Sequence, residues 1–324
     1  MQEIRKIIIR TPNFLGDTIN TTPCLQLVKK EYPEAEIIVV CPDFVADVFK
    51  YDPQVSRCIT FPIARRNHFS TYRYIWKETR KEKADLGIIF INTFMSALLF
   101  KVGGVKCIIG YNTEGRGFLL DFKRKLNRNG HYINRYAVLF NEFTGNKYTY
   151  LPELYLPISG EQTFRFDNSQ KTIGLYLGGA CKSFRRYPDD LSVSLLRLLH
   201  DNGYNLVLLG DRNDREKHHS YARHINSNII DLTGKTDTEG MLNTIAHLDT
   251  LVTIDSSALH VAAALKIPFV VLLGLSTSPT SAILPKVSHG RALKIENNLI
   301  REEDHIHNIT PEKILQAVQE VIQP

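Results

Sequence analysis

Three short segments combine glycine, acidic, hydroxyl and basic residues in patterns that could carry chemistry. They are Thr11–Asp17 (TPNFLGD), Gly178–Pro188 (GGACKSFRRYP) and Asp255–His260 (DSSALH). Each follows a run of apolar residues that predicts a buried strand. Ligands of doubly wound sheets bind beyond the carboxyl ends of the strands, so these segments are the first candidates for a site.

The first segment has one glycine, Gly16, and therefore matches neither a GxGxxG fingerprint nor a P-loop. Gly16 permits a tight turn and a close backbone approach. Asp17 is expected at the mouth of the following helix, where aspartate is a good N-cap. A carboxylate at that edge could equally act as a general base, and the sequence leaves both roles open.

The other two segments are typical of anion sites. Glycines after a strand, then a basic segment that leads into a helix, favour a phosphate, although a flexible exposed loop would read the same way. Ser256 and Ser257 are expected at the N-terminus of a short helix, where free N–H groups favour an anion. Asp255 could be only a cap. Because the G-x-S-x-G elbow is missing, a catalytic triad of Asp255, Ser256 and His260 is not expected.

A metal or disulfide framework is not expected. The five cysteines (Cys24, Cys41, Cys58, Cys107 and Cys181) are odd in number and lack CxxC spacing. The polar histidines lack a third ligand at metal-site spacing and are expected at the surface; they are His218, His219, His305 and His307. We therefore expect no metal, no cofactor and a reducing, cytoplasmic environment.

Two successive arrays of strands and helices must position these segments. In the first half, strands are expected at 4–10, 36–41, 57–61, 86–90 and 107–110, helices at 18–32, 42–50, 72–83, 96–102 and 131–144, and a mobile loop at 111–130. After a linker within 151–172, strands are expected at 172–177, 205–209, 229–231, 250–254 and 269–273, and helices at 190–202, 217–224, 239–248, 258–265 and from Pro311 on. This pattern predicts an α/β protein with two doubly wound domains, residues 1–157 and 158–324, that face a cleft.

The charge is concentrated in the first half of the chain. Of the 324 residues, 43% are hydrophobic and 23% charged, which is typical of a folded globular protein. Residues 1–160 carry 23 Lys and Arg against 15 Asp and Glu, a net charge of +8, whereas the remainder carries −2. The first half is thus expected to meet an anionic substrate or a membrane surface, and nucleic acid is disfavoured because no nucleic-acid motif surrounds the basic clusters.

Several motifs in order resemble the ADP-heptose:lipopolysaccharide heptosyltransferases of glycosyltransferase family 9, in particular the heptosyltransferase II branch. The opening IIIRTPNFLGDTINTTP is similar to the family's first strand and Gly-Asp loop, and INTFMSALLF with GYNTEGRGFLL to two further segments. LTGKTDTEGML and TIDSSALHVAAAL resemble two signatures of the second domain. Departures are Arg185 in place of a lysine, and Ser257 and Ala258 in place of glycine and proline.

The resemblance implies a GT-B fold of two Rossmann-like domains, with the acceptor bound by the first domain and the donor by the second. It implies Asp17 as the catalytic base of an inverting, metal-independent heptose transfer from ADP-L-glycero-D-manno-heptose to the inner core of lipopolysaccharide. The donor residues would be Arg185 or Lys182 at the diphosphate, Asp214 at the ribose, Thr236 at the adenine, and Asp255, Ser256, Ser257, Ala258 and His260. The acceptor residues would be Asn13, Gly16, Asn92, Arg116, Lys123 and Arg124.

The expected place of action is the inner face of the inner membrane, as a cytoplasmic protein that contacts the membrane transiently. Two alternatives stay open. One is a family member that uses another sugar nucleotide or acceptor. The other is a sugar-nucleotide-binding protein that has lost turnover through the changes at Arg185 and Ser257.

Overall fold

The computed structural model describes residues 3–63, 68–127, 132–166, 169–178, 185–223, 225, 229–274, 285, 287–295 and 305–322. The chain divides into two compact units, residues 1–157 (unit 1) and 158–324 (unit 2). Each unit has its own parallel six-stranded sheet. The predicted α/β architecture of two doubly wound sheets is therefore confirmed.

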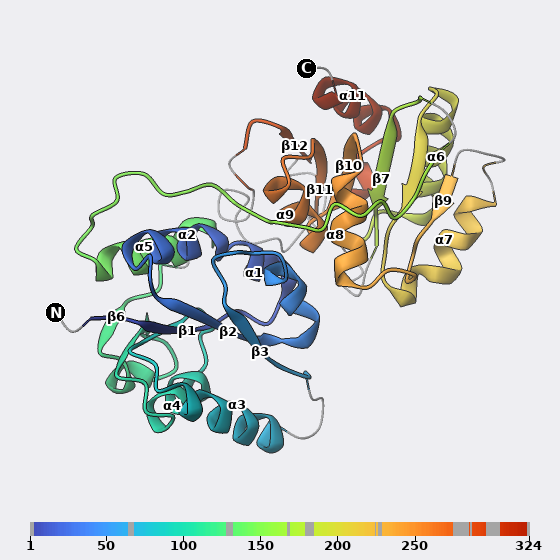
Figure 1. Cartoon of the computed structure of the whole chain (residues 1–324). Helices are drawn as coiled ribbons and strands as arrows, with labels where there is room; N and C mark the ends of the chain where they lie inside the picture. The colour runs from blue at the N-terminus through green and yellow to red at the C-terminus, as the bar shows by residue number, and fades with distance from the viewer. Residues whose placement is uncertain are drawn as a thin grey trace. The chain divides into compact units, whose positions relative to one another are not determined.

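Unit 1 has the strand order β3-β2-β1-β4-β5-β6. Its elements are β1 Lys6–Arg10, α1 Leu15–Ile19, α2 Thr22–Glu31, β2 Glu36–Pro42, the 3₁₀ segment η1 Asp43–Phe49, β3 Arg57–Phe61, α3 His68–Glu82, β4 Leu86–Ile89, α4 Phe94–Val102, β5 Cys107–Tyr111, η2 Arg116–Leu119, β6 Phe122–Arg124 and α5 Tyr132–Phe143. Helices α3 and α4 cover one face of the sheet, and α2 and α5 lie together on the other (Figure 1). The chain leaves β1 toward β2 and β3, then returns to β4 beside β1, so the strand order switches between β1 and β4.

Unit 2 has the strand order β12-β11-β10-β7-β8-β9. Its elements are β7 Thr172–Tyr176, α6 Asp189–Asp201, β8 Asn205–Leu208, η4 Arg212–Asp214, α7 Arg215–Ala222, β9 Ile229–Asp231, α8 Thr238–Ala246, β10 Thr250–Ile254, α9 Ser257–Ala264, β11 Phe269–Leu273, β12 Gly290–Lys294, η6 Ile306–Asn308 and α11 Pro311–Ile322. Helices α6, α7 and α11 pack on one face of the sheet and share a cluster of buried hydrophobic residues with it, and α8 and α9 lie on the other face (Figure 1). The order of strands here switches between β7 and β10.

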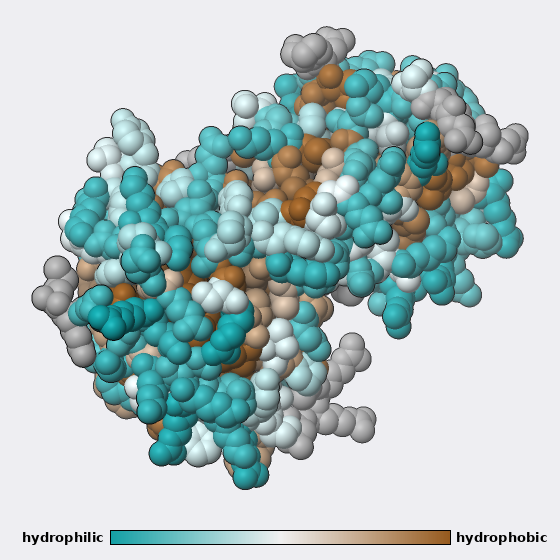
Figure 2. All heavy atoms as spheres, viewed as in Figure 1, coloured by the Kyte–Doolittle hydropathy of each residue, from teal (hydrophilic) through white to brown (hydrophobic). Residues whose placement is uncertain are grey.

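Apolar strands explain both cores. Ile7, Ile8 and Ile9 of β1 are completely buried, as a central parallel strand with helices on both faces requires. The face of the molecule in Figure 2 is mostly hydrophilic, with hydrophobic patches in both units. In the part of the chain that the structure describes, no helix is both long and apolar enough to span a bilayer.

Two expectations in unit 1 are wrong. The helix expected at 18–32 is two helices, α1 and α2, because the hydroxyl of Thr21 donates to the carbonyl of Thr18 (2.7 Å) and Pro23 starts a new first turn. The mobile loop expected at 111–130 contains η2 and β6. Gly115, at φ +70°, turns the chain there, and β6 then pairs with β5.

Candidate active site

The switch point of unit 1 holds the Gly16–Asp17 segment. Helix α1 begins directly after the loop that follows β1, and Phe14 is its N-cap, with no capping bond from its side chain. Asp17 lies in the first turn of α1 and is half-buried, so the alternative that Asp17 is the N-cap is wrong. The carboxylate therefore lies in the first turn of α1 at the carboxyl edge of the sheet, and its role as a base stays a prediction.

A pocket of about 150 Å³ opens at the same switch point. Its walls come from the end of β1, the segment after β3, helix α3, and the segment that joins β4 to α4; the lining residues include Arg10, Asn13, Phe61, Ile63, His68, Tyr72, Thr93 and Ser96. Asn13, one of the predicted acceptor residues, lines it. Asn92 lies between two lining residues, Ile91 and Thr93, and its Oδ1 atom is buried without a partner among the described residues.

The remaining acceptor predictions have different outcomes. Arg116 is completely buried and donates to the carbonyls of Tyr111 (2.9 Å), Ile91 (2.6 Å) and Thr93 (2.9 Å). Burial lowers the pKa of its guanidinium to about 10. An arginine enclosed in this way holds the loops after β4 and β5 together. Its Nη2 atom is buried without a hydrogen-bond partner among the described residues, and contact of Arg116 with an acceptor stays a prediction.

The two basic residues of β6 are partly engaged by neighbours. The ammonium of Lys123 donates to the carbonyl of Gly117 at 3.2 Å, and Arg124 forms an ion pair with Glu142. Lys123 is exposed, and the side chain of Arg124 is 51% exposed. Contact of either with an acceptor stays a prediction.

The switch point of unit 2 brings the last two sequence segments together. Arg185 follows β7, Asp255 follows the neighbouring strand β10, and Nη1 of Arg185 lies 3.3 Å from Oδ2 of Asp255. Burial raises the pKa of the Asp255 carboxyl, and the charge of Arg185 opposes that rise. Asp255 is thus the ion-pair partner of Arg185 rather than a helix cap. Lys182 falls outside the described residues.

Helix α9 begins as predicted. Ser256 is its N-cap, and its hydroxyl accepts from the N–H of Ala258 at 3.2 Å. Ser257 is the first helical residue, and His260, 7% exposed, lies one turn further on. The positive end of the α9 dipole and the Arg185 cation therefore lie at the ends of adjacent strands, an arrangement that favours an anion.

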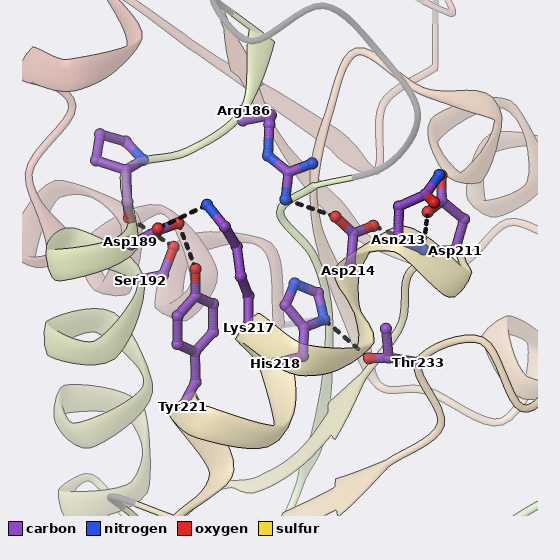
Figure 3. A network of polar contacts seen from close by, with 11 residues as sticks. Arg186, Asp189, Ser192, Asp211, Asn213, Asp214, Lys217, His218, Tyr221 and Thr233 are labelled. Carbon is purple, nitrogen blue, oxygen red and sulfur yellow. Dashed lines mark hydrogen bonds and ion pairs between the residues drawn. The ribbon is translucent and has the colours of Figure 1, made fainter.

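Asp214 lies in a buried polar network instead of at an open surface (Figure 3). Its side chain is 0% exposed, Oδ1 accepts from Nη2 of Arg186 at 2.5 Å, and Oδ2 accepts from the N–H of Asp211 at 3.2 Å. A Cβ atom on Gly178 would lie 2.6 Å from that Oδ1, so only glycine fits there. Both oxygens of Asp214 are hydrogen-bonded and enclosed in this arrangement, and its contact with the ribose stays a prediction.

His218 completes the network. It is 2% exposed, so the expectation of a surface histidine is wrong, and its Nδ1 lies 2.8 Å from the hydroxyl of Thr233. Burial lowers the pKa of the imidazole. Thr236 is half-buried in the segment between β9 and α8, and its contact with adenine stays a prediction. Among the described residues, no group of three or more His, Cys, Asp and Glu could hold a metal ion.

Reasoning from sequence missed Arg10 and the structural use of Arg186. Arg10 ends the buried strand β1 at the centre of the sheet, 5% exposed, and lines the unit 1 pocket. A basic residue that closes an apolar run at a switch point is the signal that could have identified it. Arg186 had no such signal, because two adjacent arginines in a loop do not reveal which one turns inward.

Comparisons with known proteins match the chain over most of its length. The family model described as "Glycosyltransferase family 9 (heptosyltransferase)" matches residues 72–300. The chain is 27% identical to lipooligosaccharide heptosyltransferase 2 of Haemophilus ducreyi over 98% of this chain and 99% of that protein. It is 25% identical to lipopolysaccharide heptosyltransferase 2 of Escherichia coli, over 98% of each chain.

Solved structures share the fold. The structure of the E. coli ADP-heptose lipopolysaccharide heptosyltransferase II matches with a TM-score of 0.85 and 24% identity over 98% of each chain. A family 9 glycosyltransferase from Veillonella parvula matches with a TM-score of 0.87 and 21% identity, over 99% of this chain and 98% of that one. The two sheets are thus those of the GT-B heptosyltransferase fold.

Proposed function

The chain belongs to glycosyltransferase family 9, and from that premise we propose that it is a heptosyltransferase of type II. Unit 2 binds ADP-L-glycero-D-manno-heptose, unit 1 binds the inner core of lipopolysaccharide, and the heptose passes from the first ligand to the second. The relatives named as heptosyltransferase 2 support this choice, because the likeness extends over nearly the whole of both chains.

The observation on which the donor assignment depends is the ion pair of Arg185 with Asp255, directly before the N-cap Ser256 of α9, at the switch point of unit 2. A sugar nucleotide leaves as a diphosphate, so negative charge grows on its oxygens in the transition state. A guanidinium and the free N–H groups of a helix N-terminus stabilise that charge where it develops. Lys182 is a further candidate for the same diphosphate.

For the chemistry we propose an inverting transfer in which Asp17 is the general base. An acceptor hydroxyl is a poor nucleophile at neutral pH, and a carboxylate takes its proton as the oxygen attacks the anomeric carbon in line. The new bond forms on the face opposite the leaving ADP, so the configuration inverts. Arg185 and α9 supply the positive charge that a divalent cation supplies in other transferases, which is the support for a metal-independent reaction.

We propose that the protein works at the inner face of the inner membrane, as a peripheral cytoplasmic protein. Unit 1 carries the net charge of +8, which suits an anionic glycolipid. Three bulky apolar side chains near the pocket are strongly exposed: Phe14 (72%), Phe69 (77%) and Phe118 (75%). Exposed aromatics beside basic residues are typical of a surface that meets a lipid interface.

The test is ADP release upon addition of ADP-heptose and a heptose-truncated core glycolipid. Release that requires both substrates supports the proposal. A thermal-shift comparison separates the alternatives, because a ligand that binds only the folded state raises the melting temperature. A larger shift with UDP-sugars than with ADP would indicate another donor, and binding of ADP-heptose without turnover on any core acceptor would indicate a binding protein.

A further inference from the structure

Arg10 is a buried cation without a counter-charge in the part of the chain that the structure describes. Its guanidinium donates to neutral oxygens: Nη1 to the carbonyls of Thr11 (2.5 Å) and Val40 (3.5 Å), and Nη2 to Oδ1 of Asn13 (2.6 Å). The Cζ atom of its guanidinium lies 4.8 Å from the ring centre of Phe61. Burial lowers the pKa of this guanidinium to about 10, so it stays charged at neutral pH.

Among the described residues that line it, the pocket beside Arg10 has no carboxylate. These lining residues include neither Asp nor Glu, and Arg10 is the one permanent charge that the described part of the wall contains. The polar groups that share the wall with it are able to donate hydrogen bonds; they are the hydroxyls of Thr71, Tyr72, Thr93 and Ser96 and the ring of His68. Glu114 accepts from the N–H of Phe94 at the start of α4 but does not line the pocket.

Buried charges in proteins are normally paired, because the loss of hydration is costly. A guanidinium has five N–H donors, and three hydrogen bonds account for the protein partners of Arg10 among the described residues. Two donors are thus left on a cation that borders an open space of about 150 Å³. The missing partner is one that a ligand can supply.

We propose that this pocket is a subsite for an anionic group, a carboxylate or a phosphate, carried by the acceptor, and that Arg10 is the residue that pairs with it. The subsite lies at the switch point of unit 1, beside the loop that leads from Asn13 to Asp17. An acid group fixed there would hold the acceptor at the end of β1, the strand whose following loop leads to the proposed base. The proposal rests on the acceptor role of unit 1, but its first test needs no transfer reaction.

Thermal shift with two probes tests the subsite and its chemistry. Inorganic phosphate and glucuronate are each added to the full chain, with sodium chloride at matched ionic strength as reference. We expect at least one probe to raise the melting temperature above the chloride reference, and the more effective probe identifies the group. The Arg10→Met variant should bind that probe roughly 10- to 100-fold more weakly, the size of a charge-assisted hydrogen bond.

Matched variants separate binding from stability. Arg73→Met removes the same charge from an exposed position of α3 that does not line the pocket, and it should keep the full response. Arg10→Lys keeps a charge on a single point and should respond weakly. No shift in the wild type, or an unchanged response in Arg10→Met, overturns the proposal. An ADP response that depends on Arg10 would also overturn it, because the residue would then belong to the donor.

Kinetics link the subsite to the acceptor. With the core glycolipid, Arg10→Met should raise the Michaelis constant for the acceptor and leave that for the donor unchanged. With an acceptor whose carboxyl groups are reduced and phosphates removed, wild type and variant should become equal. Absence of any transfer by the wild type would contradict the proposed function and not the subsite, whose probe binding is measured separately.

Discussion

At the scale of single residues, a mutation of Asp17 separates its proposed role as catalytic base from its contribution to the stability of α1. Phe14 occupies the N-cap of α1, and Asp17 lies in the first helical turn. Asn is nearly the same size and cannot accept the proton of an acceptor hydroxyl. We expect Asp17→Asn to lower turnover by about two orders of magnitude or more, in line with the typical contribution of a general base. The measurement is ADP release at saturating substrates.

Stability and donor binding are the controls for that variant. The melting temperature should hardly change, because a first-turn carboxylate contributes only about 0.3–1 kcal/mol to a helix. The shift caused by ADP should persist, since the donor residues lie in unit 2. Turnover close to that of the wild type would exclude Asp17 as the base.

Arg185 and Arg186 are neighbours with different expected roles. Arg185 pairs with Asp255 at 3.3 Å beside the start of α9, whereas Arg186 pairs with the enclosed Asp214. We expect Arg185→Ala to raise the Michaelis constant of the donor and lower turnover, with a smaller loss of stability than Arg186→Ala, because Asp255 is less enclosed than Asp214 and its ion pair is longer. Lys182→Ala should do less than Arg185→Ala, and the opposite order in donor titrations would assign the diphosphate to Lys182.

Arg186→Ala is the matched control for Arg185→Ala. It leaves a buried carboxylate without its cation, and breaking a buried pair typically costs about 3–5 kcal/mol. We expect Arg186→Ala to lower the free energy of unfolding, measured in urea, and to have a much smaller effect on catalysis. Equal stability of the two alanine variants would contradict this division of roles.

Residue types and spacing could predict part of the site. The hydroxyl residues after an apolar strand predicted that Ser256 and Ser257 lie at the N-terminus of α9, because helix starts have a local signal. The possible cap offered by the sequence was Asp255, whereas the structure has Ser256 in that position. The environments of Asp214 and Arg116 could not be predicted, because both depend on contacts with segments distant in the sequence. Gly178 approaches Asp214 from the segment after β7, and the carbonyl of Ile91 binds Arg116 from the segment after β4.

At the scale of elements, apolar runs predicted the central strands, and prolines predicted the end of α2, before Pro33, and the start of α11, at Pro311. The edge strands β6 and β12 were missed. Their sequences, FKR and GRALK, are short and largely polar, because an edge strand has less of its surface buried. The split between α1 and α2 was missed because Thr21 bonds back to the preceding turn, an interaction that competes with a continuous helix.

Helix α7 carries a prediction about pH. His218 is buried in the native state with a lowered pKa, whereas an unfolded chain exposes it with a pKa near 6.5. Below that value the unfolded state binds more protons than the folded state, so acidification favours unfolding. We expect the free energy of unfolding to fall as the pH drops through the range below about 6.5.

His218→Gln tests that assignment, because glutamine keeps a polar group near Thr233 and does not titrate there. Urea unfolding at pH 7.5 and pH 5.5 gives the loss of stability for each protein. The variant should lose less stability on acidification than the wild type. Equal losses in the two proteins would mean that groups other than His218 cause the loss of stability at low pH.

At the scale of the whole molecule, charge is divided between the units. Unit 1 carries +8 and unit 2 carries −2, although both have the same sheet topology. The common fold therefore does not require this asymmetry, and an anionic partner for unit 1 accounts for it. Exposed charges are screened beyond about 10 Å at roughly 0.1 M salt, so long-range attraction by unit 1 should weaken as salt rises.

Binding to vesicles with anionic lipids is the prediction that joins charge and exposed apolar surface. Phe69 starts α3, and Phe118 follows β5, so both lie at the carboxyl edge of the unit 1 sheet, as the pocket does. Removing both rings by Phe69→Ser and Phe118→Ser should weaken vesicle binding roughly ten- to a hundredfold, because each aromatic that enters a lipid interface contributes about 1 kcal/mol or more. The control, Val102→Ser with Tyr150→Ser, removes apolar side chains that are 53% and 88% exposed and do not line the pocket. It should bind vesicles as the wild type does, and added salt should weaken binding in both. Equal flotation of the two double variants with anionic vesicles would assign the exposed rings of the pocket edge to something other than a membrane.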